Sequence, residues 1–125
     1  MRDPFVAIAS DGSPTSRHPR GHGTFAKWIE AFAVRNPLVT LEEAVRKVTG
    51  LPASILRLPD RGILREGAVA DLILFDPQNV RARADYVNPF THAEGFDLVL
   101  LGGVPAFENG ERIAAAGRLL RHRGA

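Results

Sequence analysis

The sequence lacks cysteine entirely, and this absence removes several kinds of chemistry at once. Without thiols the chain can form no disulfide, no cysteine-ligated zinc site and no thiolate nucleophile. Long apolar runs are missing as well. The run near the N-terminus covers only residues 5–9, which is too short for a secretory signal core or a membrane span. We therefore expect a cytoplasmic protein with no membrane partner.

An excess of charge of one sign is also missing. Sixteen Lys and Arg residues against fourteen Asp and Glu leave a formal net charge of +2. Lysine is limited to Lys27 and Lys47, and the basic residues gather only at Arg118, Arg121 and Arg123. A short basic tail of this kind is typical of a solvated terminus, so we expect no nucleic acid partner.

The length sets an upper bound on the architecture. A chain of 125 residues that is 45% hydrophobic has the size of one domain and can bury a substantial core. A closed (β/α)₈ barrel needs roughly 250 residues. The length therefore excludes a complete barrel enzyme.

The first half of the chain alternates strand and helix signals. Residues 5–9 are continuously apolar, which favours a strand buried on both faces, and a Gly- and Pro-rich loop follows to residue 23. Thr24 is the predicted N-cap of a helix with one apolar face. A capping box at residues 40–43 predicts a helix over 41–49 that ends at Gly50 and Pro52. A further short helix is expected over residues 53–58.

The second half is predicted to be mostly β. Residues 72–75 form a strand, and residues 78–96 form a loop with a helical turn near 81–86. Turns at Gly102-Gly103 and Asn109-Gly110 predict strands over 98–101 and 104–107 and a short strand near 112–113. Pro105 implies an edge or a bulge in this hairpin. The fold class is therefore α/β at first and then mostly β.

The candidate site residues lie in the first loop. Asp11 follows the expected strand, where a carboxylate can ligate a metal or act as a general base, or can simply cap its own turn. Arg20 has the planar fork that binds a carboxylate through two hydrogen bonds. His18 and His22 lie four residues apart and are either metal ligands or structural residues of the loop.

Two sets of motifs resemble known enzymes. The segment from Gly62 to Asp76 resembles the connection, in metal-dependent amidohydrolases, between the barrel and a small β-sandwich. The motifs Ser10-Asp11-Gly12, His18-Pro19-Arg20 and Gly23-Thr24-Phe25 are similar to those of the N-acyl-D-amino-acid deacylases, or D-aminoacylases. The resemblance implies that residues 1–60 are a C-terminal barrel segment, with its last strand, active-site loop and helices, and that residues 61–125 are part of the β-sandwich.

The resemblance also implies a reaction. The family hydrolyses the amide bond of N-acyl-D-amino acids with zinc held in the barrel, and Asp11 corresponds to its metal-site residue and general base. Arg20 would bind the substrate carboxylate, with His18 beside it in the substrate loop. The sequence departs from the family at His22, where the family usually has Tyr, and at Gly102, where it usually has Asn.

Most of the family's metal ligands have no counterpart in this sequence. A catalytic zinc site needs three protein ligands and an open position, and Asp11 alone does not provide them. We therefore expect the isolated chain to bind no zinc and to be inactive. The alternative is a non-catalytic module that forms a homo-oligomer or pairs with a complementing chain that supplies the rest of the barrel. The apolar segment 5–9 and the helix face of Phe25, Trp28 and Phe32 would need such a cover.

Overall fold

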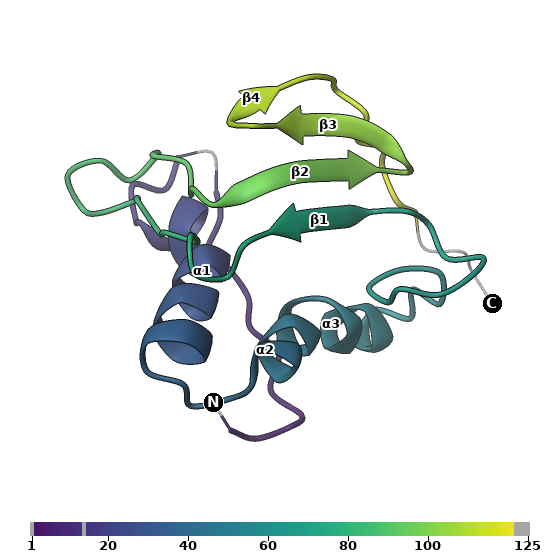
Figure 1. Ribbon diagram of the computed structural model, residues 1–125, viewed down its shortest axis with the longest axis horizontal. Coiled ribbons are helices and arrows are strands. Elements are labelled where there is room, and N and C mark those ends of the chain that lie inside the picture. The colour runs from purple at the N-terminus through teal and green to yellow at the C-terminus, as the bar shows by residue number, and fades with distance from the viewer. Residues whose placement is uncertain (1, 14, 122–125) are drawn as a thin grey trace.

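The computed structural model describes residues 2–13 and 15–121; Arg123 of the predicted basic tail lies outside this range. A helical part is followed along the chain by an antiparallel sheet (Figure 1). The elements in chain order are α1 (Arg20–Trp28), η1 (Ile29–Arg35), α2 (Leu41–Val48), α3 (Gly50–Ile55), β1 (Leu72–Phe75), β2 (Phe96–Leu101), β3 (Val104–Glu108) and β4 (Glu111–Arg112).

Helix α1 begins earlier than its sequence predicts. Its N-cap is Pro19, and Thr24 lies inside the helix, where its hydroxyl donates to the carbonyl of Arg20 at 2.7 Å. The predicted cap at Thr24 is therefore wrong. Gly23 in the first turn is buried and packs against residues 82–84, where a Cβ would lie 3.4 Å from that of Ala84. The helix therefore includes two glycines despite their low helix propensity.

The helix widens after Trp28 into the π-helical segment η1. Its last turn closes with a bond from the Asn36 N–H to the Ala31 carbonyl at 3.1 Å. The Trp28 indole N–H donates to the Ala44 carbonyl at 2.9 Å and thereby ties α1 to α2. Glu30 is buried in η1 and accepts the Ala82 N–H at 2.9 Å. The π-helical turn thus carries a buried carboxylate that fixes the start of the 82–86 segment.

Helix α2 confirms the predicted N-cap, whereas α3 departs from its prediction. The Thr40 hydroxyl accepts the Glu43 N–H at 3.2 Å. Helix α2 ends at Val48, close to the predicted end, but the next helix begins at Gly50 rather than at the predicted residue 53, so that Gly50 and Pro52 form the first turn of α3. Proline is tolerated there because its missing N–H would have no partner within the helix.

The sheet agrees with the predicted meander. Its order is β1-β2-β3-β4, all antiparallel, and β1 covers the predicted residues. The pairing register shifts between Val99 and Leu100, beside Pro105, so the predicted irregularity is confirmed. The turn between β3 and β4 has Asn109 at φ 49° and Gly110 at φ 90°, the left-handed conformations that an Asn-Gly turn requires.

Two predicted elements are absent from the described residues. Residues 5–9 form no strand, and Phe5 is 84% exposed, so the burial on both faces that a parallel strand needs is missing. This segment is held instead by Lys47, whose buried ammonium donates to the carbonyls of Asp3 and, at 2.9 Å, of Val6. The helical turn predicted near 81–86 is also absent.

The loop from residue 76 to residue 95 is closed at its base by backbone contacts. Arg81 and Glu94 exchange two backbone hydrogen bonds of 3.1 and 3.0 Å. Val80 is fully buried, and Gly95, at φ 86°, packs directly against the backbone of Asn79. The two ends of the loop are therefore fixed while its tip reaches toward α1 (Figure 1).

The core lies where the helices meet this loop. It consists of the buried residues Ala26, Trp28, Ile29, Ala44 and Val80. The rings of Phe75 and Phe96 pack against it from the ends of β1 and β2. None of the helices in residues 2–13 and 15–121 is long and apolar enough to cross a membrane.

Candidate functional site

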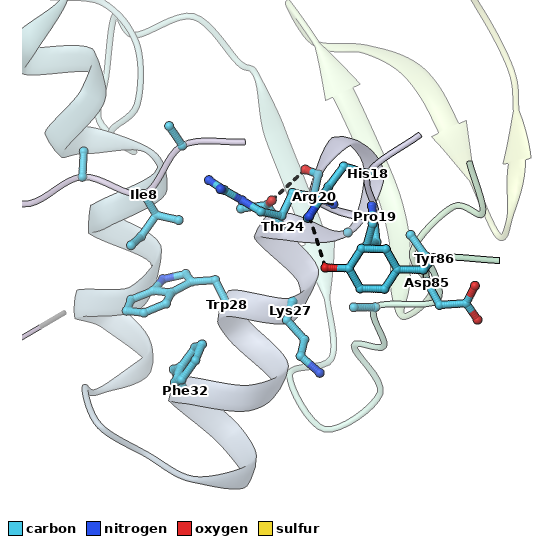
Figure 2. A pocket seen from close by; sticks show the side chains of 15 residues that line it. Ile8, His18, Pro19, Arg20, Thr24, Lys27, Trp28, Phe32, Asp85 and Tyr86 are labelled. Atoms are coloured by element: carbon cyan, nitrogen blue, oxygen red, sulfur yellow. Dashed lines mark hydrogen bonds between the residues drawn. The ribbon is translucent and has the colours of Figure 1, made fainter. Parts of the chain in front are cut away.

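A cavity of about 750 Å³ lies between α1, residues 7–9 and residues 82–86. Figure 2 shows its apolar wall, formed by Ile8, Trp28 and Phe32. His18 and Arg20 enter it from the start of α1. An apolar wall with a few polar groups at one end is the usual form of a small-molecule site.

Two predicted site residues contact each other at this cavity. The Arg20 guanidinium lies 3.2 Å from the Asp11 carboxylate, and the two side chains are 54% and 65% exposed. An ion pair this exposed contributes little to stability and can open readily. Arg20 also lines the cavity, so its guanidinium can exchange Asp11 for the carboxylate of a ligand.

His18 links Arg20 to a residue that sequence reasoning missed. Its Nδ1 accepts the Arg20 backbone N–H at 3.1 Å, and its Nε2 lies 3.3 Å from the Tyr86 hydroxyl. The two rings meet edge to face at 5.2 Å between centroids (Figure 2). Tyr86 is the chain's only tyrosine and lies in a polar loop, but no pattern in the sequence pairs it with His18. A substrate contact by His18 itself stays a prediction.

His22 lies in a different environment from His18. Its ring contacts Phe90 edge to face at 5.6 Å and His92 at 5.7 Å, measured between centroids. Arg17 covers the same Phe90 ring at 5.9 Å. His18 and His22 therefore contact different parts of the 76–95 loop.

The described residues do not fit a zinc ion by themselves. No group of three or more histidine or acidic side chains able to hold a metal occurs within residues 2–13 and 15–121. The carboxylate of Asp11 faces a guanidinium, which repels a cation. A zinc site that includes Asp11 would need ligands from outside the described residues.

The resolved shifts in pKa lie away from the cavity, and all but that of Glu42 arise from ion pairs. Two hydrogen bonds from Arg46, of 2.7 and 2.9 Å, lower the pKa of Glu43, and the same bonds raise the pKa of Arg46. The ion pair of Arg83 with Glu94 lowers the pKa of Glu94 and raises that of Arg83. These pairs brace α2 and the base of the 76–95 loop.

Comparison with known proteins identifies the class. The sequence profile of the amidohydrolase family matches residues 2–107. Because the match covers most of the chain, this protein belongs to the amidohydrolase family.

The particular relatives are deacylases of N-acyl-D-amino acids. Over 114 residues the chain is 39% identical to an N-acyl-D-aspartate deacylase of Alcaligenes xylosoxydans xylosoxydans. This match covers 90% of this chain and 23% of that protein. It is 40% identical over 103 residues to a D-aminoacylase of the same organism, covering 81% of this chain and 21% of that protein. The predicted resemblance to this family is confirmed.

A solved structure shows the same arrangement. The N-acyl-D-glutamate deacylase from Bordetella bronchiseptica, crystallised with zinc and a phosphonate inhibitor, superposes with a TM-score of 0.81 at 36% identity. The match covers 86% of this chain and 23% of that one. The chain thus spans less than a quarter of the length of these relatives and has the fold of an amidohydrolase region.

Proposed function

We propose that this chain is the C-terminal portion of a zinc-dependent N-acyl-D-amino-acid deacylase, with Asp11 as general base and Arg20 as carboxylate receptor. The observation that carries the proposal is the contact of these two groups, 3.2 Å apart, at the edge of an apolar cavity. In this assignment residues 1–60 belong to the barrel and residues 61–125 to the β-sandwich. The relatives that match nearly the whole chain support it.

The chemistry assigned to this chain is binding and proton transfer. The Arg20 guanidinium releases Asp11 and takes the carboxylate of the N-acyl-D-amino acid through two hydrogen bonds. The freed Asp11 carboxylate accepts a proton from the water that attacks the acyl carbon, and passes this proton to the amine as the C–N bond breaks. The products are a carboxylate and a free D-amino acid. Zinc, which would polarise the carbonyl, would be held mainly by residues outside this chain.

Complementation tests this assignment. The chain should release no D-amino acid from N-acetyl-D-methionine or N-acetyl-D-glutamate, with or without zinc. When the remaining segment of the N-acyl-D-aspartate deacylase is supplied as a second chain, hydrolysis should appear and be lost with Asp11→Asn or Arg20→Gln. Turnover by the isolated chain that Asp11→Asn abolishes would contradict the expected inactivity. Restored hydrolysis that survives both substitutions would contradict the assigned roles.

A second candidate is a non-catalytic module that self-associates or pairs with a complementing chain. The exposed apolar side chains favour it: Phe5 is 84% exposed, Phe25 is 45% exposed, and Ile73 on the edge strand β1 is 56% exposed. Such surfaces are typical of protein interfaces. This candidate differs from the first in needing no contact between Arg20 and a carboxylate.

A further inference from the structure

We propose that Tyr86 is a substrate-binding residue, which donates a hydrogen bond from its hydroxyl to an oxygen of the N-acyl-D-amino acid that Arg20 holds. The inference rests on the proposed function and adds a contact from the 76–95 loop to the same cavity. The argument comes from the direction of the hydrogen bonds that join Arg20, His18 and Tyr86.

The first bond fixes the tautomer of His18. A backbone N–H can only donate, so the Arg20 N–H, 3.1 Å from Nδ1 of His18, requires a lone pair on that nitrogen. In the neutral imidazole ring the hydrogen then lies on Nε2. The backbone at the start of α1 therefore decides which nitrogen of His18 is the donor.

The second bond fixes the direction of the Tyr86 hydroxyl. Nε2 of His18 lies 3.3 Å from this oxygen, and the neutral ring donates to it. Because the oxygen accepts from His18, its own O–H remains free to donate elsewhere. Tyr86 is 77% exposed and lines the cavity, so a ligand can reach this donor.

Two of the donors that line the cavity differ in kind. Arg20 offers a charged fork and Tyr86 a single neutral O–H, on either side of His18 (Figure 2). Both are complementary to oxygen acceptors, which an N-acyl-D-amino acid carries on its carboxylate and on its acyl carbonyl. Tyr86 is thus matched to a ligand oxygen, whereas both ring nitrogens of His18 already face protein atoms.

The tautomer can be tested without any ligand. Nitrogen-15 NMR of the imidazole side chains, with the His18 signals assigned from His18→Gln, should show hydrogen on Nε2 and none on Nδ1. Hydrogen on Nδ1 would overturn the inference, because the Tyr86 hydroxyl would then have to donate to His18.

The ligand contact can be tested by calorimetric titration with N-acetyl-D-methionine. Tyr86→Phe removes only the hydroxyl and should weaken binding roughly 3- to 10-fold, as expected for one hydrogen bond. Thr91→Val removes a hydroxyl in the same loop whose side chain bonds the Asn88 carbonyl, and it should bind like the wild type. D-methionine lacks the acyl group and therefore shows which ligand oxygen accepts from Tyr86. If Tyr86→Phe weakens binding of D-methionine as much as that of N-acetyl-D-methionine, the acceptor is the carboxylate. If it does not weaken binding of D-methionine, the acceptor is the acyl carbonyl.

Arg20→Gln separates this inference from the proposed function. If Arg20→Gln weakens binding and Tyr86→Phe does not, the role of Tyr86 is overturned and the proposed function stands. If wild-type protein binds no ligand, or neither substitution matters, both are overturned for this chain. A loss with both substitutions and none with Thr91→Val supports both.

Discussion

At the residue scale, Asp11 pairs with Arg20, whose side chain lines the cavity. Asp11→Asn should change the free energy of unfolding by less than about 1 kcal/mol, because the pair is mostly exposed. The same change should tighten binding of N-acetyl-D-methionine, since the Arg20 guanidinium no longer has a charged internal partner. Calorimetric titration measures this affinity. Asp97→Asn, on β2 and outside the cavity lining, provides the matched loss of charge and should leave the affinity unchanged.

The two lysines provide a second comparison at this scale. Lys47 is fully buried and donates to the carbonyls of Asp3 and Val6, whereas Lys27 is exposed on α1. Lys47→Met keeps the length of the side chain but removes these bonds, and should lower the free energy of unfolding by about 1–3 kcal/mol. Lys27→Met should have almost no effect. Urea denaturation followed by circular dichroism measures both, and equal effects would show that Lys47 does not hold the N-terminal segment.

At the element scale, the acidic residues of α2 make stability depend on pH. Hydrogen bonds from Arg46 hold the pKa of Glu43 below its ordinary value of 4.5. Hydrogen bonds from the Glu42 backbone N–H and from the Thr40 side chain likewise lower the pKa of Glu42. A carboxyl group whose pKa is lower in the folded than in the unfolded chain stabilises the folded state at pH values above its unfolded pKa. This stabilisation is lost as the pH falls through the pKa of the folded state. The urea concentration at the midpoint of unfolding should therefore decrease as the pH is lowered below about 4.5. Glu43→Gln should flatten this decline, and an unchanged slope would contradict the prediction.

In the turn after α3, Gly62 is harder to replace than Gly67. Gly62 and Gly67 both have positive φ, 74° and 79°. A Cβ on Gly62 would lie 2.7 Å from that of Ala53 and 2.8 Å from the Thr49 carbonyl oxygen, while one on Gly67 meets nothing within 4 Å. Gly67→Ala should cost about 1–2 kcal/mol from backbone strain alone. Gly62→Ala should cost about 1–3 kcal/mol more from overpacking, as measured by urea denaturation.

Local signals in the sequence predicted the elements that local chemistry decides. Thr40 caps α2, and the turns at residues 102–103 and 109–110 place the strands of the meander. The failures concern elements that depend on distant partners. Residues 5–9 have the composition of a buried strand, yet within the described residues they pair with no strand. The start of α1, which the sequence placed too late, includes Gly23, which packs against residues 82–84 more than fifty positions away.

The candidate site was predictable to a similar degree. Asp11 and Arg20 stand out because of their residue types and their place in a motif, and the structure brings them together. Tyr86 could not be found in this way, because it lies 68 positions along the chain from His18, and only the folded 76–95 loop brings the two side chains together.

At the scale of the whole molecule, the sheet has an exposed apolar edge. Strand β1 lies at the sheet edge with Ile73 and Leu74 more than half exposed, and an unprotected apolar edge favours pairing with another chain. Sedimentation velocity should show oligomers that grow with concentration. Ile73→Lys should shift the distribution toward monomer, whereas Glu111→Lys on the opposite edge strand β4 should not. A monomer at every concentration would count against the interaction module.

Because the 76–95 loop is closed at its base, the length of its tip should have little effect on the stability of the sheet. The backbone bonds between Arg81 and Glu94 and the close packing of Gly95 hold the two ends together whatever lies between them. Because the entropy of closing a loop rises only slowly with its length, residues between 86 and 92, beyond the contacts of residues 82–84 with Glu30 and Gly23, can be added, removed or exchanged at small cost. This loop carries Tyr86 to the cavity, so ligand preference could diversify there by insertion and deletion while the framework beneath it stays the same.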